Sequence, residues 1–525
     1  MFETLKRIRA LRSLLLPVYN ATVRKVLNSY RYWIFRNEPA FPPLPADAPE
    51  VVPVRVMPDG RFMIQGAKEI TVEAGALMEA FPKAGWFALI EDGAVFSERG
   101  IPAVRRAILD SADAELIYGD TDRLTASGRR TEPWFKPDFN IYAFRQENLL
   151  RPLCVVRREL LLRAAAPGAA ISWPELTFRL VEAASRVDHC PEILTHWMAE
   201  YDPAGAAVLA LENEALRAHL NRTRIDARIY PLRALPCRRV RYALRSAPLV
   251  SILIPNKDQR ELLARCVASI RERTTYPNYE ILIIENNSVT PEIEAYYREL
   301  EADPAFPGKV IRYPGRFNFS LINNWGVGRS KGELLLFLNN DTEVLSPNWL
   351  EEMVSLAIRE DVGAVGAKLL FPDRKIQHAG VGFGSFGERW LFHVYEGLAE
   401  TAPSYHGATR KLTPTLAVTG ACLMMRRALF DEIGRFPADL PIVYNDIEIC
   451  FAAFARGKTN LFTPFARLVH YESASRGKTL TEAELETIRR DFRRLIGRYP
   501  EIYRRPDPFY SPRLTFDQMY FEKIT

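Results

Sequence analysis

The sequence predicts an α/β fold with mixed, mainly parallel sheets, arranged as two tandem domains of which the first is incomplete. Three features of the chain support this prediction. Buried strands alternate with a helical pattern over residues 248–288, an apolar strand over 334–338 ends in acid, and parts of this second half have counterparts within residues 86–197. Strands that alternate with helices imply right-handed crossovers and a parallel sheet whose loops meet at one edge.

The alternation begins with a β-branched run at 248–255, which is too short for a helix and opens onto a polar loop. Apolar residues then recur at helical spacing over 260–273, and a second strand follows over 279–285. The order strand, helix, strand predicts that the ends of both strands face the same crevice as the acidic end of 334–338.

The strand over 334–338 runs directly into Asn339, Asn340 and Asp341, with Glu343 close behind. Mg²⁺ and Mn²⁺ prefer oxygen ligands, and in open α/β sheets ligands bind at the carboxyl ends of strands. A cation held here could clamp a diphosphate. The alternative is an Asx-turn, in which the Asn and Asp side chains only hydrogen-bond their own backbone.

Short motifs follow one another through the second half of the chain. They are Val250–Pro255, Thr275–Glu280, Phe317–Ser320 with Asn323 and Asn324, Leu338–Glu343, Gly363–Leu369, Gln377–Gly380, Thr419–Cys422, Tyr444–Cys450 and His470–Gly477. In this order they resemble the family 2 glycosyltransferases, and within them the bacterial O-antigen and rhamnosyltransferase-like group. The resemblance implies the GT-A fold and transfer of a sugar from a nucleotide-diphosphate donor, which would be a dTDP-, UDP- or GDP-sugar.

The resemblance also implies which residues hold the donor. The set assigned to the nucleotide sugar is Pro255, Asn256, Asp258, Glu285, Asn287, Arg316, Asn324 and Asn340. Asn256, Asp258 and Glu285 would contact base and ribose, since carboxylates accept hydrogen bonds from ribose hydroxyls and base N–H groups. Glu285 stands where the family often has Asp, and its alternative role is that of a solvated loop acid.

For the metal, the resemblance implies a site built on Asp341 and His470. The Asp-x-Asp motif usual in this fold lacks its first carboxylate here, because Asn339 occupies that position. Asp341 is then the principal ligand of Mg²⁺ or Mn²⁺, and diphosphate and water complete the shell. The alternative for His470 is a satisfied core histidine. Arg476, shortly after it, supplies a cation for diphosphate.

Inverting sugar transfer needs a base that deprotonates the acceptor hydroxyl, and the resemblance places this base at Asp446. Asp446 could instead cap a helix, a position that Asp favours. Glu448 could bind an acceptor hydroxyl or cap the same helix. Thr419 and Gly420 fit a tight loop that substrate approaches closely.

The first half of the chain repeats part of the second. The aligned segments are Trp86–Ser97 with Leu335–Ser346, Leu153–Leu160 with Ala421–Ala428, and Trp173–Phe178 with Tyr444–Ile449. No run resembling Val250–Pro255 is evident in the first copy, so its nucleotide-binding half is expected to be truncated or rebuilt. Asp120 and Asp122 form an Asp-x-Asp that matches nothing catalytic in the second copy, which favours a structural or acceptor-binding role.

The chain is therefore expected to have five parts. These are a basic amphipathic segment at 1–45, a degenerate GT-A-like domain at 46–210, a helical linker at 211–247, a catalytic GT-A domain at 248–480, and a basic C-terminal helix and tail at 481–525.

Positive charge is concentrated at the N-terminus. Residues 1–40 contain eight basic and two acidic residues, which account for the net charge of +6 of the whole chain. Apolar residues recur between the cations, which predicts either a helix lying peripherally on the cytoplasmic face of the inner membrane or an ordinary solvated helix. No apolar run reaches the about 18 residues of a spanning helix, and no cleavable signal is evident. The six scattered cysteines favour a reducing compartment.

The sequence thus predicts a cytoplasmic, inverting, metal-dependent hexosyl- or rhamnosyltransferase. Its acceptor would be a lipid-linked or polysaccharide glycan of O-antigen-like synthesis, and no motif indicates nucleic acid as a partner. The alternative is not an enzyme but a non-catalytic nucleotide- or glycan-binding protein whose metal motif has decayed. The presence of Asp341, Asp446 and His470 together favours the enzyme.

Overall fold

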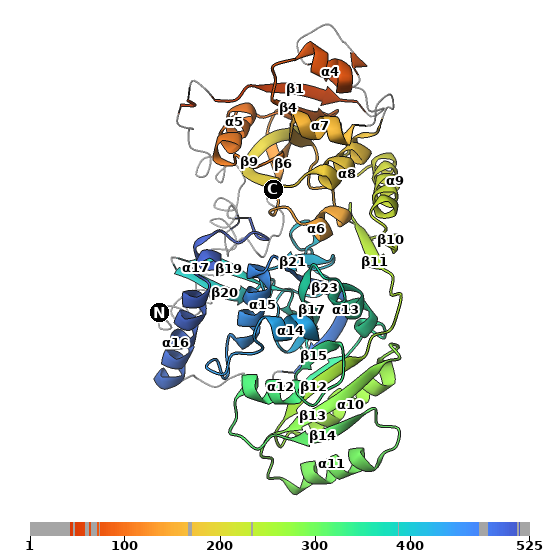
Figure 1. Ribbon diagram of the computed structural model, residues 1–525, viewed down its shortest axis with the longest axis vertical. Helices are drawn as coiled ribbons and strands as arrows, with labels where there is room; N and C mark the ends of the chain where they lie inside the picture. Colours follow the sequence, from red (N-terminus) through yellow and green to blue (C-terminus); the bar gives the residue numbers. More distant parts are fainter. Residues whose placement is uncertain are drawn as a thin grey trace.

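This computed structural model describes residues 43–45, 48–57, 62–64, 71–72, 74–165, 171–232, 235–386, 388–471, 481–511 and 514. The described chain forms two large mixed sheets, which follow one another along the longest axis of the molecule (Figure 1). The strands of the first sheet come from residues 51–197 and those of the second from residues 250–470. The predicted α/β class with two tandem sheets is confirmed.

The second sheet has the strand order β14-β13-β12-β15-β22-β17-β23-β16. In that order the strands are Gly308–Arg312, Tyr279–Glu285, Val250–Asn256, Leu334–Leu338, Cys422–Arg426, Val362–Leu370, Thr459–His470 and Thr342–Val344. The first four strands are all parallel, β22 is antiparallel to both of its neighbours, and β17 is again parallel to β23. β18 (Ile376–His378) pairs with β17, and β21 (Thr413–Thr415) with β23.

Helices cover both faces of the second sheet because alternate strand residues point to opposite sides. The helices are α10 (Arg260–Arg273), α11 (Pro291–Ala302), α12 (Phe319–Val327), α13 (Trp349–Ala357), α14 (Arg427–Glu432) and α15 (Asn445–Ala455). In β12, Ile252 and Ile254 face the core that contains residues of α10, α11 and α13. Leu253 faces the opposite core, which contains residues of α12, α14 and α15.

The first sheet repeats this topology with the order β3-β2-β1-β4-β8-β6-β9-β5. In that order its strands are Thr71–Val72, Phe62–Ile64, Val51–Val56, Trp86–Glu91, Leu153–Arg157, Leu116–Leu124, Val187–Trp197 and Ala94–Phe96. Even the register is shared, since Leu89 pairs with Cys154 as Leu338 pairs with Cys422. Its remaining elements are β7 (Arg130–Trp134), α4 (Ala74–Ala80), α5 (Gly100–Asp110), α6 (Ile141–Gln146), α7 (Arg158–Ala164) and α8 (Trp173–Ala183).

The nucleotide-binding half of the first copy is rebuilt, as expected, but it does contain a counterpart of the strand β12, which the sequence did not reveal. This counterpart is β1, which runs parallel to β4 as β12 runs parallel to β15. Pro53 and Arg55 interrupt its β-branched run, so the sequence does not show a continuous apolar strand. The rest of the nucleotide-binding half is rebuilt, since the neighbouring strands β2 and β3 are short and antiparallel.

The linker is helical only in its first part, contrary to the prediction for 211–247. α9 (Ala206–Arg222) is followed by an antiparallel hairpin of β10 (Ala227–Pro231) and β11 (Arg238–Tyr242). Tyr and Val residues, which favour strands, alternate with the arginines of this segment and permit the antiparallel pairing. The many charged residues do not indicate strands in the sequence. A second hairpin, β19 (Val381–Phe386) and β20 (Glu388–His393), follows β18, and a 3₁₀ turn spans Tyr405–Gly407.

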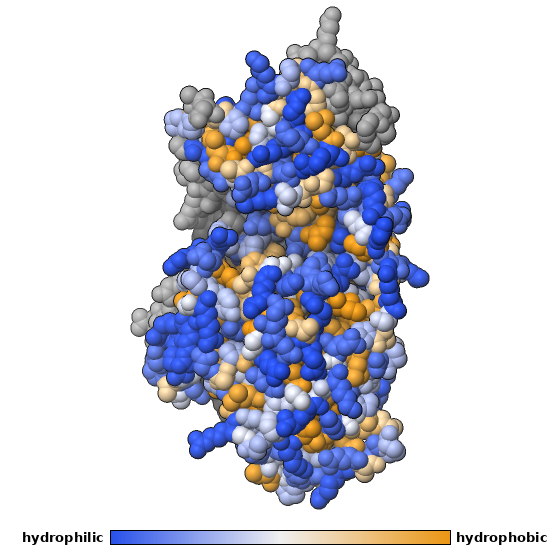
Figure 2. Space-filling view, in the orientation of Figure 1, coloured by the Kyte–Doolittle hydropathy of each residue, from blue (hydrophilic) through white to orange (hydrophobic). Residues whose placement is uncertain are grey.

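The predicted basic C-terminal helix is α16 (Glu482–Arg498), followed by α17 (Pro500–Arg504). Thr481 and Glu484 form a capping box at its start. Its exposed surface is strongly hydrophilic (Figure 2). The basic segment at residues 1–40 lies outside the described residues. No helix in the described part of the chain is both long and apolar enough to cross a membrane.

α6 holds the two sheets together (Figure 1). The Tyr142 hydroxyl donates to the Asp361 carboxylate at 2.9 Å, and Asn140 Nδ2 donates to Thr459 Oγ1 at 3.1 Å. Gln146 donates to the backbone oxygen of Leu412 at 2.5 Å and accepts from its N–H at 2.9 Å. These polar contacts, of which the Gln146–Leu412 pair is buried, link the two domains.

Candidate active site

Asp341 and His470 meet at the edge of the second sheet, because β16 pairs with β23 and brings the ends of both strands together. Asp341 Oδ1 lies 3.1 Å from His470 Nε2, and the two side chains are only 15% and 11% exposed. The backbone oxygen of Asp341 accepts the N–H of Tyr471 at 2.9 Å, which holds the loop against β23.

This pair has the chemistry of a divalent-metal site. Asp341 Oδ1 is buried and accepts no hydrogen bond, although an unsatisfied buried carboxylate oxygen is costly. A carboxylate oxygen and an imidazole nitrogen are both ligands for Mn²⁺-type cations. No cluster of three Asp, Glu, His or Cys side chains was found among the described residues, so donor oxygens and water would supply the remaining ligands. Glu343 is engaged elsewhere, with the Tyr471 hydroxyl at 2.6 Å and Arg273 at 3.4 Å.

The residues expected at the base and ribose lie together at the ends of β12, β13 and β15. Asn340 Nδ2 donates to Asn256 Oδ1 at 2.5 Å, and Asn256 Nδ2 donates to the Tyr297 hydroxyl at 2.8 Å. Pro255, the preceding residue in β12, pairs with Ile284 of β13. Tyr297 of α11 was not predicted, because its sequence position shows only a helical apolar pattern.

The loops after β12 and β13 are held by their own side chains. Asp258 Oδ1 accepts the N–H groups of Val289 and Thr290 at 2.6 and 3.1 Å, and the Val289 hydrogen bond is the main cause of its lowered pKa. Glu285 is buried and accepts the N–H of Ser288 at 2.5 Å, so it is not a solvated loop acid. Asn287 has a positive φ of 57°, which Asn tolerates better than most residues.

Two further residues of the expected donor set, Asn324 and Arg316, and the cation expected at Arg476 remain to be placed. Asn324 joins α12 to the chain before α15, donating to the backbone oxygen of Phe436 at 2.8 Å and accepting its N–H at 3.2 Å. This double contact indicates a structural function for Asn324. Arg316 is exposed between β14 and α12, where its guanidinium remains available to an anion. Arg476 lies outside the described residues.

Asp446 lies in the first turn of α15, but it is not the capping residue. The helix begins at Asn445, and Tyr444 occupies the cap with a left-handed φ of 64°. Asp446 Oδ2 accepts the N–H of Gly420 at 2.7 Å, and Oδ1 accepts the N–H of Ile447 at 2.8 Å. A Cβ at Gly420 would lie 3.3 Å from the Asp446 Cβ, so the close approach of the loop explains the glycine.

Glu448 does not cap the helix either. Its Oε1 accepts the hydroxyl of Tyr499, at the end of α16, at 2.8 Å. Burial raises the pKa of Glu448. The contact anchors the C-terminal helix beside α15, which indicates a structural role.

A chain of contacts connects Asp446 with Asp341. Thr419, next to Gly420, has its N–H 3.5 Å from Nε2 of His378, and the preceding Gln377 accepts from His470 Nδ1 at 2.5 Å. Burial lowers the pKa of His378 well below its ordinary value, so its ring is neutral and Nε2 can accept. No role was predicted for Gln377 and His378, although they belong to one of the motifs of the resemblance.

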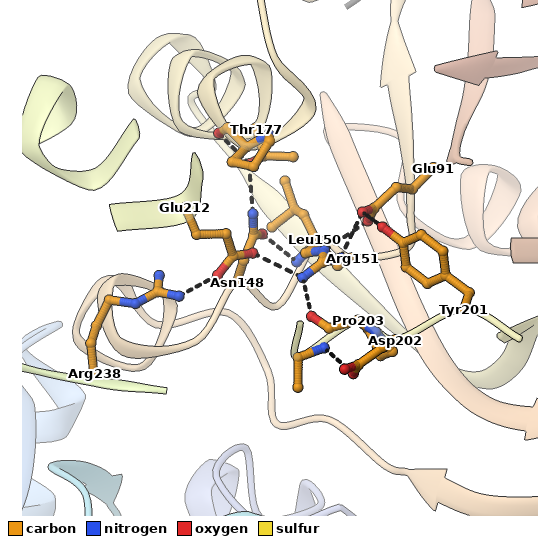
Figure 3. Close-up of polar contacts among 12 residues, drawn as sticks. Glu91, Asn148, Leu150, Arg151, Thr177, Tyr201, Asp202, Pro203, Glu212 and Arg238 are labelled. Carbon is orange, nitrogen blue, oxygen red and sulfur yellow. Dashed lines mark hydrogen bonds and ion pairs between the residues drawn. The ribbon is translucent and has the colours of Figure 1, made fainter. Parts of the chain in front are cut away.

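In the first copy the corresponding positions are filled by internal ion pairs (Figure 3). The alignment places Arg151 at the position of Thr419 and Glu91 at that of Asn340. Arg151 is buried and donates twice to the Glu91 carboxylate, at 2.7 and 2.6 Å, and once to Glu212 at 3.3 Å. Glu212 also pairs with Arg238 of the linker hairpin. A buried guanidinium and its carboxylate partner therefore take the positions that Thr419 and Asn340 hold in the second copy.

The other functional positions of the first copy have changed as well. Ala94 pairs with Trp197 as Glu343 pairs with Val469, which places Met198 at the position of His470. Glu175 stands at the position of Asp446 and forms ion pairs with Arg179 and Arg222, both at 2.7 Å.

The Asp-x-Asp of the first copy lies on β6 and is engaged within the domain. Asp120 Oδ1 lies 2.8 Å from Nε2 of His189, and Asp122 Oδ2 accepts from Arg130 at 2.6 Å. Both aspartates are buried. This environment favours a structural role for the motif over the acceptor-binding role that was also predicted.

We expect the double substitution Asp120→Asn and Asp122→Asn to leave donor hydrolysis per folded molecule within about two-fold of wild type, while lowering the thermal midpoint. The loss of stability follows because each aspartate is the buried partner of a cationic or histidine side chain. Hydrolysis assays, normalised to the folded fraction from circular dichroism, provide the measurement. Loss of turnover in the folded fraction would show that the first domain carries chemistry.

Replacing Arg151 by Leu is expected to lower the free energy of unfolding of the first domain by about 3–5 kcal/mol, because Glu91 then remains as a buried charge without a cationic partner, while Glu212 keeps only Arg238. The matched control is Arg163→Leu, which breaks an ion pair with Glu115 whose arginine is 46% exposed. That variant should lose about 1 kcal/mol or less. Urea unfolding followed by fluorescence compares the two, and equal losses would contradict the prediction.

Comparisons with known proteins identify a family model and several similar chains. Residues 251–434 match the family model for glycosyl transferase family 2. The O-antigen biosynthesis protein RfbC of Myxococcus xanthus is 37% identical over 433 residues, which cover 80% of this chain and 33% of that protein. The uncharacterized protein y4gI of Sinorhizobium fredii is 33% identical over 453 residues, which cover 84% of this chain and 49% of y4gI. The chain thus spans only a third to a half of the length of these relatives.

Two solved structures are similar in fold. The mannosyltransferase PcManGT from Pyrobaculum calidifontis, in complex with GDP-Man and Mn²⁺, is 16% identical with a TM-score of 0.38, covering 51% of this chain and 68% of that one. GalNAc-T7 with UDP, GalNAc and Mn²⁺ is 18% identical with a TM-score of 0.40, covering 49% of this chain and 50% of that one.

The strands from β13 to β22, with Asp341 among them, lie within the part of the chain that matches the model for glycosyl transferase family 2. The part of the chain matched by the family model, residues 251–434, belongs to glycosyl transferase family 2.

Proposed function

We propose that this protein is an inverting, metal-dependent glycosyltransferase. It moves a sugar from a nucleotide-diphosphate donor to a hydroxyl of a lipid-linked or polysaccharide acceptor in O-antigen-like glycan synthesis. The observation that carries the proposal is the linked arrangement of the Asp341–His470 pair and Asp446 along one edge of the sheet. The resemblance to RfbC supports the glycan class.

The residues of the candidate site have separate roles in the proposed reaction. Asp341 and His470 would hold Mg²⁺ or Mn²⁺, which when bound neutralises charge on the donor diphosphate. Asp446 accepts the proton of the acceptor hydroxyl, whose oxygen forms a bond to the anomeric carbon. The bond from that carbon to the diphosphate breaks, and its electron pair leaves with the nucleoside diphosphate. Attack from the face opposite the leaving group inverts the anomeric configuration.

The first copy supports catalysis by the second rather than the non-catalytic alternative. A decayed site of this fold is visible at Arg151, Glu175 and Met198, where ion pairs and an apolar side chain take the functional positions. The second copy keeps Asp341, Asp446 and His470, and a buried carboxylate oxygen of Asp341 remains unsatisfied. In the first copy the aspartate at the position of Asp341 is Asp92, and it is paired with Arg55 at 3.2 Å.

We further propose that the protein acts at the cytoplasmic face of the inner membrane, through the cationic segment at residues 1–40. An amphipathic cationic helix binds anionic lipid through both charge and apolar area.

A thermal-shift panel of nucleotide sugars, each with Mn²⁺ or with a chelator, tests the proposed function. A ligand that binds only the folded protein raises its stability by about 2.7 kcal/mol at 100 times the dissociation constant. We expect one of the dTDP-, UDP- or GDP-sugars to raise the thermal midpoint only when Mn²⁺ is present. The proposal fails if no donor stabilises the protein, or if the chelator changes nothing.

A further inference from the structure

Gln377 holds the imidazole of His470 from the side opposite Asp341. Its Oε1 lies 2.5 Å from His470 Nδ1, and both side chains are buried. An amide oxygen can only accept a hydrogen bond, so Nδ1 carries the proton of the neutral ring. Nε2 faces Asp341 Oδ1, 3.1 Å away, and a cation held between them would take its lone pair.

We propose that Gln377 is a positioning residue that holds His470 in the tautomer able to ligate a metal with Nε2. A histidine ligand commonly donates its second ring N–H to an acceptor that fixes tautomer and ring orientation. The inference rests on the proposed metal-dependent function, and it assigns a role to a residue outside the Asp341–His470 pair itself.

The fold around Gln377 suits this role. Gln377 is the middle residue of β18, which pairs with β17, while His470 ends β23 on the other side of β17. Its backbone oxygen lies 3.2 Å from His393 Nδ1 of the hairpin β19–β20. Gln377 is thus fixed by the sheet on one side and by the hairpin on the other.

Asn339 supports the same assignment. Its Nδ2, an N–H donor, lies 3.3 Å from His470 Nε2. A donor placed there is compatible with a lone pair on Nε2 and not with a proton on that nitrogen. Gln377 as acceptor and Asn339 as donor therefore favour the same tautomer, while the Asp341 carboxylate, 3.1 Å from Nε2, faces that lone pair without strain only when a cation lies between them.

The first copy provides a comparison within one chain. Met198 stands at the position of His470 there, and a thioether needs no partner that selects a tautomer. The site that lacks the histidine has filled its centre with the Arg151–Glu91 pair instead. An acceptor at Gln377 is useful only where His470 is present.

Two measurements test the role of Gln377. Nitrogen-15 NMR of histidine-labelled, metal-free protein reports the tautomer of each of the seven histidines, and the His470→Asn variant identifies the His470 signal. We expect protonation at Nδ1 in wild type and in Gln377→Glu, which keeps the acceptor. In Gln377→Leu the proton should move to Nε2 in part or completely.

Electron paramagnetic resonance then measures the binding of Mn²⁺ alone. Gln377→Leu should weaken binding by about 10- to 100-fold, as is usual when such a supporting partner is lost, and Gln377→Glu should stay within about three-fold of wild type on the same scale. Gln146→Leu, which removes a buried glutamine at the domain interface, is the matched control and should leave Mn²⁺ affinity unchanged.

The outcomes separate this inference from the proposed function. Wild-type protein that binds no Mn²⁺ would refute metal dependence, while the tautomer of metal-free His470 still decides the role of Gln377. The positioning role is overturned if Gln377→Leu keeps the Nδ1–H tautomer, or if it binds Mn²⁺ as tightly as wild type.

Discussion

Replacing Asp446 by Asn is expected to lower the rate of sugar transfer at saturating donor by about 10²–10⁴, the usual contribution of a general base. The amide keeps the shape of the carboxylate but cannot take up a proton. Donor binding should remain normal, because Asp446 contacts the Gly420 loop and its own helix rather than the residues assigned to the nucleotide.

The structure also predicts a modest loss of stability in this variant. Both carboxylate oxygens of Asp446 accept backbone N–H groups, from Gly420 and from Ile447, and the NH₂ group of Asn cannot accept. One N–H therefore loses its partner, which costs about 1–3 kcal/mol if it is buried. Single-turnover transfer and donor titration on the folded protein give the measurement. Turnover within a few-fold of wild type would place the base elsewhere and make Glu448 the next residue to test.

The second large effect is expected for Asp341→Ala, which should abolish metal-dependent binding of the nucleotide sugar. The substitution removes the carboxylate that faces His470 Nε2 at 3.1 Å and leaves the histidine as the single protein ligand. A cation of the Mg²⁺ class does not remain bound at such a site without carboxylate oxygen. The fold should persist, because Asp341 is only partly buried and lies in a loop.

Isothermal titration calorimetry with Mn²⁺ and donor measures this effect. The matched control is Asp92→Ala, since Asp92 stands at the same position in the first copy, where it pairs with Arg55 at 3.2 Å. The control should bind donor as wild type does. Unchanged donor affinity in Asp341→Ala, or donor binding in wild type that a chelator does not weaken, would contradict the assignment.

The sequence alone predicted the bounds of those helices and strands whose hydrophobic pattern is continuous. α10 spans Arg260–Arg273 and β13 spans Tyr279–Glu285, as their periodicity predicted, because one face of the helix and most of the strand are buried. β1 was missed since Pro53 and Arg55 break its apolar run, and its pairing with β4 and β2 makes it a strand.

The site was predictable where the residue type itself carries chemistry. Asp341, His470 and Asp446 could be selected as titratable groups within motifs, whereas Gln377 and Tyr297 act through partners distant in sequence. Asn324 was assigned to the donor, but its side chain holds the backbone of Phe436. The sequence does not show which group the side-chain amide of an Asn or Gln in a motif will contact.

The buried arginine of the first domain has an evolutionary consequence. Loss of Arg151 alone would leave the buried Glu91 without its cationic partner and Glu212 with Arg238 only, so a single substitution at this position is destabilising. An opening there needs a change at Glu91 together with the change at Arg151. The ion pairs therefore oppose any stepwise conversion of the first domain into a copy of the second, because stability is lost at the first substitution.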